Sequence, residues 1–257
     1  MLCAVAVGTI ASEINIVSEN LSLSIVIPAY NEARRLPGTL VEVVEYLAGR
    51  PEYLPAELIT VDDGSRDGTP VVVETFAPRP RIAVRLVRLP RNSGKGAAVR
   101  AGLAASRGAR VLVSDADLAT PIEEVARLWD TGAAVSVGSR ALQRELISRR
   151  QPLPRDYLGR GFNLAVRALR LTTMRDTQCG FKLLDGELAR RLAGELRLNG
   201  FAFDVELLAR ARRAGATIVE VPVRWRHVDD SRVRPLRHGI GMLRDALRVR
   251  WWLWTGH

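Results

Sequence analysis

Short aliphatic segments with acidic side chains close behind them recur along the chain, and this repeat restricts the possible folds more than any other feature. Residues 23–28 (LSIVIP), 57–65 (ELITVDDGS) and 111–117 (VLVSDAD) are of this kind, and stretches with helical spacing alternate with such segments. Continuous aliphatic strands alternating with helices are typical of a mostly parallel sheet that helices cover on both faces. We therefore predict an α/β fold whose ligands collect at the carboxyl ends of the strands.

The same spacing predicts the individual elements. The basic stretch 144–160 is expected to be an irregular, mobile loop ahead of a helix at 161–171. Further strands are predicted at 82–89, 134–140 and 217–225, and further helices at 35–47, 69–77, 94–106, 186–196 and 201–215.

The domain organisation follows from the absence of any linker rich in Pro, Ser or Gly and of any internal repeat. We expect a loosely ordered N-terminal extension at residues 1–22, one domain at 23–235 and an amphipathic C-terminal helix at 236–257. The apolar residues 2–11 are too few for a membrane span and lack the basic start of a signal peptide.

Charge is distributed unevenly around a formal net value of +10. Residues 140–257 carry 24 basic and 12 acidic side chains, against 14 and 16 in residues 1–139. The second half therefore suits an anionic partner such as lipid headgroups, a phosphorylated substrate or nucleic acid. A nucleic-acid binder without chemistry would leave the acid clusters unexplained. The two cysteines form no disulfide framework, which favours a reducing, cytoplasmic location.

Acidic and basic side chains at strand ends are the candidates for chemistry. Asp115 and Asp117 can hold Mg²⁺ or Mn²⁺ together with substrate phosphates, although a solvated turn is the competing interpretation. Asp62 and Asp63 precede a glycine turn, where they either contact a ligand or stabilise the turn itself. Lys95 lies between two glycines at a predicted helix N-terminus, a place suited to an anion.

Seven segments in order carry a resemblance to inverting family 2 glycosyltransferases of the GT-A fold. They are SIVIPAYNE, VDDGSRDGT, NSGKGAAV, SDADLATP, GSR, DTQCGFK and FDVELL, and the resemblance extends from residue 24 to about residue 250. Within that family the chain is most similar to dolichyl-phosphate β-glucosyltransferases and polyprenyl-phosphate relatives. The resemblance thus implies a nucleotide-sugar donor, a lipid-linked phosphate acceptor and no nucleic acid.

The resemblance also implies roles for individual residues. The metal ligands would be Asp115 and Asp117, and in mannose synthases a glutamine two positions later completes the site, where this chain has Ala119. Lys95 would face the metal and the diphosphate. The donor nucleotide would contact Pro28, Tyr30, Glu32, Asp62, Asp63, Lys95, Asp115, Ala116 and Asp117.

A polyprenyl phosphate is ionised near neutral pH, so it needs cations to position it but no general base. The candidates for the acceptor side are Arg140, Arg155, Gln178, Lys182 and Arg232. Asp204 and Glu206 are about 200° apart on a helix, so only one of them is expected to face the site. Asp204 would be a catalytic base for a hydroxyl acceptor, or would orient Lys182 or an arginine for a phosphate acceptor.

Residues 236–254 combine apolar residues at helical intervals with arginines and three tryptophans near the end. This pattern suits peripheral contact with an anionic membrane, and equally a C-terminal helix packed on the core. Three alternatives for the chemistry stay open: GDP-mannose as donor, a hydroxyl acceptor, and a nucleotidyltransferase that releases pyrophosphate.

Overall fold

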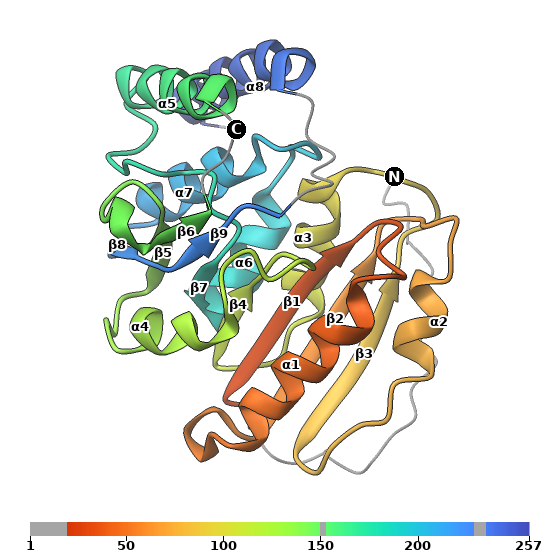
Figure 1. The fold of residues 1–257 in the computed structure, drawn as a ribbon. Helices are drawn as coiled ribbons and strands as arrows, with labels where there is room; N and C mark the ends of the chain where they lie inside the picture. The colour runs from red at the N-terminus through yellow and green to blue at the C-terminus, as the bar shows by residue number, and fades with distance from the viewer. Residues whose placement is uncertain (1–19, 150–152, 229–234, 257) are drawn as a thin grey trace.

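The computed structural model describes residues 20–149, 153–228 and 235–256 (Figure 1). Its centre is a seven-stranded sheet in the order β3-β2-β1-β4-β7-β5-β8. The strands are β1 (Leu23–Ala29), β2 (Ala56–Asp62), β3 (Ile82–Arg88), β4 (Arg110–Val113), β5 (Val135–Ser139), β7 (Lys182–Asp185) and β8 (Ile218–Pro222). All neighbouring strands are parallel except β7, which runs antiparallel to both β4 and β5.

Helices cover both faces of this sheet. They are α1 (Leu36–Ala48), α2 (Thr69–Glu74), α3 (Lys95–Ala105), α4 (Val125–Trp129), α5 (Leu153–Ala168), α6 (Gly186–Glu195), α7 (Phe203–Arg213) and α8 (Pro235–Thr255). Short 3₁₀ turns lie at Pro51–Tyr53, Ile122–Glu124 and Arg144–Leu146. A second sheet pairs β6 (Ile147–Arg149) with β9 (Trp225–Arg226).

The central strands are mostly aliphatic because both of their faces are covered. Alternate residues of β1 enter different cores: Val26 packs with the side chains of α3, α6 and α7, whereas Ile25 and Ile27 pack with those of α1. The period of two along a strand explains this division. The predicted α/β architecture, a mostly parallel sheet between helices, is therefore confirmed.

Three predictions for the second half need correction. The stretch 144–160, predicted to be an irregular loop, contains a 3₁₀ turn, β6 and the start of α5 at Leu153. Pro154 is compatible with this earlier helix start, because the first turn needs no amide donor. The strand predicted at 217–225 is divided, since β8 ends at Pro222 and β9 pairs in the second sheet. The antiparallel β7 was not predicted as a strand.

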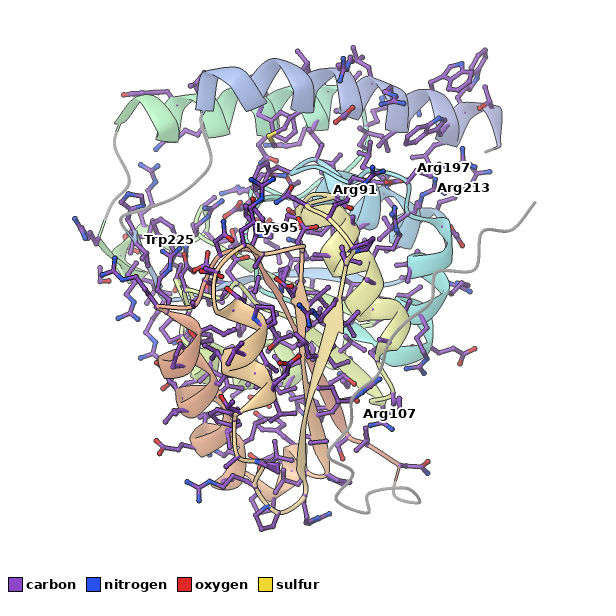
Figure 2. The ribbon with its side chains drawn as sticks, turned by 90° about the vertical axis from the view of Figure 1, so that its right-hand side faces the viewer. Arg91, Lys95, Arg107, Arg197, Arg213 and Trp225 are labelled. Carbon is purple, nitrogen blue, oxygen red and sulfur yellow. The ribbon has the colours of Figure 1, made fainter. Side chains whose placement is uncertain are left out.

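Strand register brings distant segments together at one end of the sheet. Ala29 is paired with Asp62, so the segments that follow β1 and β2 leave the sheet side by side. Val113 is paired with Lys182, so the residues before β7 lie beside those after β4. Helices α5 and α8 lie side by side across this end of the molecule, as both views show (Figures 1 and 2). No helix within the described ranges has both the length and the apolar character needed to cross a bilayer.

Candidate active site

A cavity of about 630 Å³ lies at the carboxyl ends of β1, β2 and β4, and residues of α5 and α8 close it from above. Lys95 and Trp225, both in its wall, lie between the sheet and the helix pair in Figure 2. The wall includes most of the predicted site residues: Pro28, Tyr30, Glu32, Asp63, Lys95, Asp115, Ala116, Asp117, Arg140, Gln178 and Asp204.

Asp115 and Lys95 form the central ion pair of the cavity. Lys95 Nζ lies 2.5 Å from Asp115 Oδ1, and the two side chains keep 22% and 37% of their surface exposed. Burial alone would raise the pKa of the Asp115 carboxyl, but the charge and hydrogen bond of Lys95 hold that pKa below its usual value. Burial and the neighbouring Asp115 charge raise the pKa of Asp117. The carboxylate pair thus concentrates negative charge that one lysine only partly neutralises.

A tight turn after β4 orients the two carboxylates. Leu118 N donates to Asp115 O at 3.2 Å, and Ala119 N donates to Asp117 Oδ1 at 3.0 Å. Leu118 is buried and has a φ of +43°, a strained conformation for a branched residue. Thr39 of α1 donates to Ala116 O at 2.7 Å. The turn is therefore held both by its own hydrogen bonds and by a hydrogen bond from α1.

The donor chemistry of the pair fits a hard divalent cation with a diphosphate. Within the described ranges no group of three or more His, Cys, Asp or Glu side chains could surround an ion. Two carboxylates that leave further positions for phosphate oxygens and water are the usual arrangement for Mg²⁺. Asp115 and Asp117 are therefore the residues that would hold such an ion.

Asp63 lines the cavity while its carboxylate organises the loop before α3. It accepts hydrogen bonds from Ser93 N at 2.7 Å and Gly94 N at 2.9 Å. Burial raises the pKa of Asp63, and these two amides partly oppose the rise. Asp62 instead accepts from Ser65 N at 3.0 Å, is 2% exposed and does not line the cavity. The predicted donor contact of Asp62 is therefore replaced by a role in holding its loop.

The start of α3 is not the open anion site that the sequence suggested. Gly96 N and Ala97 N donate to Asn199 O at 2.8 and 3.4 Å, so a backbone carbonyl already occupies these amides. A Cβ on Gly96 would lie 2.5 Å from Leu198 O, and one on Gly94 would overlap Asn199 O. The missing side chains of Gly94 and Gly96 therefore make room for the backbone of residues 198–199 and not for a ligand. Lys95 is therefore the group at this end of α3 that can meet an anion.

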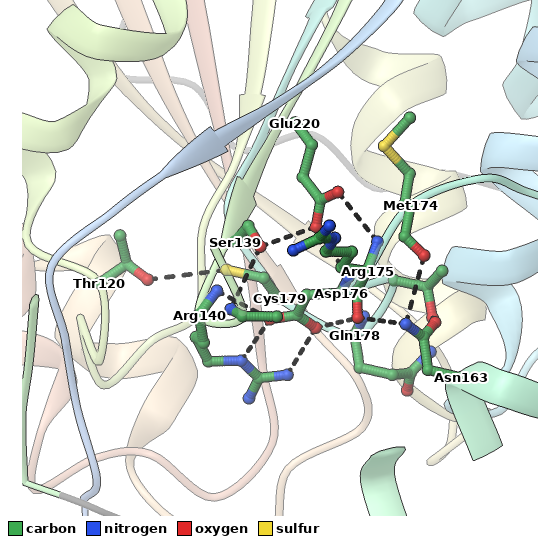
Figure 3. Close-up of polar contacts among 12 residues, drawn as sticks. Thr120, Ser139, Arg140, Asn163, Met174, Arg175, Asp176, Gln178, Cys179 and Glu220 are labelled. Carbon is green, nitrogen blue, oxygen red and sulfur yellow. Dashed lines mark hydrogen bonds and ion pairs between the residues drawn. The ribbon is translucent and has the colours of Figure 1, made fainter. Parts of the chain in front are cut away.

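Arg140, at the end of β5, is held rigidly in the wall (Figure 3). Its Nε and Nη2 donate to Asp176 at 2.7 and 2.8 Å, and its backbone N donates to the same carboxylate at 3.0 Å. Glu220 of β8 in turn accepts from Asp176 N at 2.8 Å. The guanidinium also lies 5.4 Å from the ring centroid of Trp225. Despite burial, the Arg140 charge holds the pKa of Asp176 below its usual value.

Asp204 and Glu206 at the start of α7 have different surroundings, in agreement with their predicted separation. Asp204 lines the cavity and accepts from Lys182 Nζ at 2.6 Å. Glu206 is fully buried and accepts from Leu198 N at 2.8 Å and from Arg210 Nε at 2.9 Å. Burial raises the pKa of Asp204, and the Lys182 charge opposes that rise.

The acceptor-side candidates are only partly brought together. Arg140 and Gln178 line the cavity, but Lys182 does not: it is 1% exposed, and its ammonium also donates to Cys179 O. Lys182 is therefore too buried to contact an acceptor directly. Its ammonium instead holds the Asp204 carboxylate in place. Arg155 belongs to α5, of which only the backbone is described at that position, and Arg232 lies outside the described residues.

Sequence reasoning missed several residues of the wall and its support. Glu32 and Arg35 form an ion pair of 2.7 Å at the cavity. The upper wall is apolar and comes from helices α5 and α8 and the segment around β9. The missed wall residues include Arg35, Asn92, Leu158, Phe162, Gly180, Phe201, Trp225, His227 and Met242. Asn92 and Gly180 lie within the motifs NSGKGAAV and DTQCGFK, which could have pointed to them. No local motif marks the wall residues of α5, α8 and the β9 segment, whose partners are distant in sequence.

Comparisons with known proteins show which sequences and structures this chain is similar to. The family model for glycosyl transferase family 2 matches residues 24–192. The dolichyl-phosphate beta-glucosyltransferase of Mus musculus is 39% identical over 253 residues, which cover 93% of this chain and 78% of the mouse protein. That of Dictyostelium discoideum is 36% identical over 245 residues, which cover 90% of this chain and 75% of the relative.

Solved structures show the same fold at lower identity. Glucosyl-3-phosphoglycerate synthase from Mycobacterium tuberculosis, in complex with UDP, has a TM-score of 0.60 at 22% identity, covering 89% of this chain and 78% of that one. A complex of that synthase with Mn²⁺ and UDP-glucose has a TM-score of 0.57 at 22% identity, covering 89% and 77%. The chain is therefore a glycosyltransferase of the GT-A fold and belongs to glycosyl transferase family 2.

Proposed function

We propose that this enzyme transfers glucose from UDP-glucose to a polyprenyl or dolichyl phosphate with inversion, in one direct displacement. The observation that carries the proposal is one cavity in which Asp115, Asp117, Lys95 and Arg140 meet beneath an apolar wall. The carboxylates and basic side chains suit a divalent metal ion bound with the diphosphate of the donor. The apolar wall formed by α5 and α8 suits a lipid-borne acceptor.

The donor and the acceptor are supported by different comparisons. Relatives at 36–39% identity are named dolichyl-phosphate beta-glucosyltransferases. A neighbour of the same fold has been solved with Mn²⁺ and UDP-glucose, which supports Mg²⁺ or Mn²⁺ as cofactor. Such an ion would be held by Asp115 and Asp117, and when bound it would neutralise charge on the departing UDP.

Lys95 and Arg140, two basic side chains of the wall, have separate roles in binding phosphate groups. Lys95 is placed to pair with the diphosphate once a cation satisfies Asp115. Arg140 has two of its donors fixed by Asp176, while its Nη1 keeps no hydrogen-bond partner among the residues that the structure describes. We assign this donor to a phosphate oxygen, because fixed cations lower the repulsion between an anionic nucleophile and an anionic donor.

A phosphate acceptor is favoured over a hydroxyl acceptor by the position of Asp204. A hydroxyl nucleophile needs a base, and the carboxylate available for it is bound to the buried Lys182. An ionised phosphate needs no base, so Asp204 and Lys182 can instead act as a fixed pair that orders the cavity floor.

Peripheral contact with an anionic membrane on its cytoplasmic face completes the proposal. Large exposed apolar side chains gather on α5 and α8: Tyr157, Leu158, Leu164, Leu243, Leu247, Trp251 and Trp254. Exposed arginines accompany them on the same helices, among them Arg160, Arg167, Arg244 and Arg250. Apolar and basic side chains together are typical of surfaces that enter the headgroup region of anionic bilayers. Contact there would bring the cavity to a lipid-borne acceptor.

A panel of radiolabelled donors tests the reaction. Incubation with a short-chain polyprenyl phosphate and Mn²⁺ should give an organic-extractable product from UDP-glucose, with release of UDP. A product formed from GDP-mannose alone would show that the donor is GDP-mannose. A water-soluble product on a hydroxyl compound would show a hydroxyl acceptor, and release of pyrophosphate would indicate a nucleotidyltransferase.

Two isosteric substitutions test the metal site. Asp115→Asn and Asp117→Asn should each lower transfer at least about 100-fold, since each removes a charged ligand of the ion that stabilises the leaving group. Unchanged thermal unfolding is the control for folding. Parent-like turnover by both variants in the presence of a chelator would refute the proposal.

A further inference from the structure

We propose that Gly180 is a positioning residue, whose missing side chain provides the space that the Asp115 carboxylate occupies. A Cβ built on Gly180 would overlap Asp115 Oδ2 and would lie 2.5 Å from Cγ and 2.7 Å from Oδ1. All three of its nearest atoms therefore belong to one carboxylate. The φ of Gly180 is not in the left-handed region, so backbone conformation does not require glycine here.

The backbone of Gly180 has little room to retreat from a methyl group. Its neighbours Cys179 and Phe181 are both 1% exposed. Cys179 O accepts from Lys182 Nζ, and Phe181 O accepts from Gly138 N at 2.9 Å. Packed interiors resist such displacement. A side chain at position 180 would therefore move the Asp115 carboxylate, not the chain.

The carboxylate has a second close neighbour. Lys95 Nζ binds Asp115 Oδ1 at 2.5 Å, so an ammonium group and Gly180 both restrict where the carboxylate can lie. Ligand geometry at a metal site has to be correct to about 0.5 Å. Gly180 thus controls where the carboxylate meets a cation, a statement that rests on the proposed metal role of Asp115.

A double-mutant cycle in thermal unfolding tests the contact without any ligand. Gly180→Ala should lower Tm by about 1–4 °C in the parent, because the methyl group moves the Asp115 carboxylate and weakens its ion pair with Lys95. The same change should lower Tm little in the Asp115→Ala background, where all three nearest atoms are absent. An equal loss in both backgrounds would overturn the proposal. Should Gly180→Ala alone not fold, the double variant is still expected to fold.

Mn²⁺ binding in the presence of UDP, measured by electron paramagnetic resonance, tests the consequence for the site. Gly180→Ala should weaken Mn²⁺ binding at least about tenfold and raise the Mn²⁺ concentration for half-maximal transfer, with KM for the acceptor unchanged. Gly194→Ala is the matched control, because Gly194 is exposed on α6 and a Cβ there would meet nothing within 4 Å.

The two failures are distinguishable. Parent-like Mn²⁺ affinity in Gly180→Ala, combined with a clear loss in Asp115→Ala, would refute the positioning role alone. Equal Mn²⁺ binding by the parent and Asp115→Ala would refute the metal role in the proposed function, and the unfolding cycle would still decide whether Gly180 makes room for Asp115.

Discussion

Arg140 and Asp176 form a largely buried pair whose contribution to stability depends on pH. Their side chains are 24% and 8% exposed, and Arg140 holds the pKa of Asp176 below its ordinary value. A carboxyl with a lowered folded-state pKa stabilises the protein fully above its unfolded-state value of about 4. That stabilisation is lost as pH falls through the folded-state pKa.

Asp176→Asn should therefore destabilise the enzyme by about 3 kcal/mol near neutral pH, because it leaves the Arg140 charge without its partner. The deficit should shrink as pH falls below about 4, where protonation first stabilises the unfolded parent and then, at lower pH, removes the Asp176 charge in the folded parent. Urea denaturation of both proteins at several pH values measures this difference. A deficit that stays constant between pH 7 and pH 3 would contradict the prediction.

Residue types at strand ends could be predicted to form the site because the strands themselves are visible in the sequence. Asp115, Asp117 and Lys95 each follow a recognisable strand or precede a recognisable helix. The support of Arg140 could not be predicted, since Asp176 lies 36 residues further along and Glu220 lies 44 residues beyond Asp176. Only the antiparallel β7 and the register of β8 bring these groups together.

At the level of elements, α8 presents apolar residues on two sides. Ala246 and Val249 are buried against the core, and the guanidinium groups of Arg197 and Arg248 both lie over the Trp252 ring, 5.4 and 5.3 Å from its centroid. A second stripe, formed by Leu243, Leu247, Trp251 and Trp254, repeats at helical intervals and stays 42–78% exposed. Packing on the core and membrane contact are therefore compatible within one helix.

The double substitution Trp251→Ser and Trp254→Ser should reduce sedimentation with anionic liposomes at least about fivefold. Trp254 is 78% exposed and Trp251 is 54% exposed, so their loss removes interfacial anchors but little packing. Val71→Ser on α2 is the matched control, because Val71 is 56% exposed and lies on another helix. Equal liposome binding by the parent and the tryptophan variant, with Tm unchanged, would contradict membrane contact through α8.

The regular elements could be predicted where the pattern is strong, as for β1, β2 and β4, whose residues are almost all buried. The hydrophobic pattern failed to predict the elements around residues 144–160. Arginines interrupt the apolar spacing near the start of α5, and β6 has only three residues. Strand β7 is short and antiparallel, and its four residues are too few to show a period of their own. The secondary structure of such short segments is determined by the strands with which they pair in the folded protein.

At the level of the whole molecule, the cavity joins parts that fold against each other only in the native state. Its wall runs from Pro28 near the end of β1 to Met242 on α8, so no local segment contains the site. A ligand that bridges these parts binds the folded enzyme and not the unfolded chain. Ligand binding must therefore raise the free energy of unfolding of the entire domain.

UDP at about one hundred times its dissociation constant, in the presence of saturating Mn²⁺, should raise the free energy of unfolding by about 2.7 kcal/mol above the value with Mn²⁺ alone. For a chain of this length that corresponds to an increase in Tm of about 5–10 °C. Differential scanning fluorimetry measures the shift, and EDTA should remove most of it because Asp115 and Asp117 would then repel the diphosphate. GDP with Mn²⁺ serves as the nucleoside control. A larger shift with GDP than with UDP would contradict the uridine donor, and an undiminished shift in EDTA would contradict the metal-bridged diphosphate.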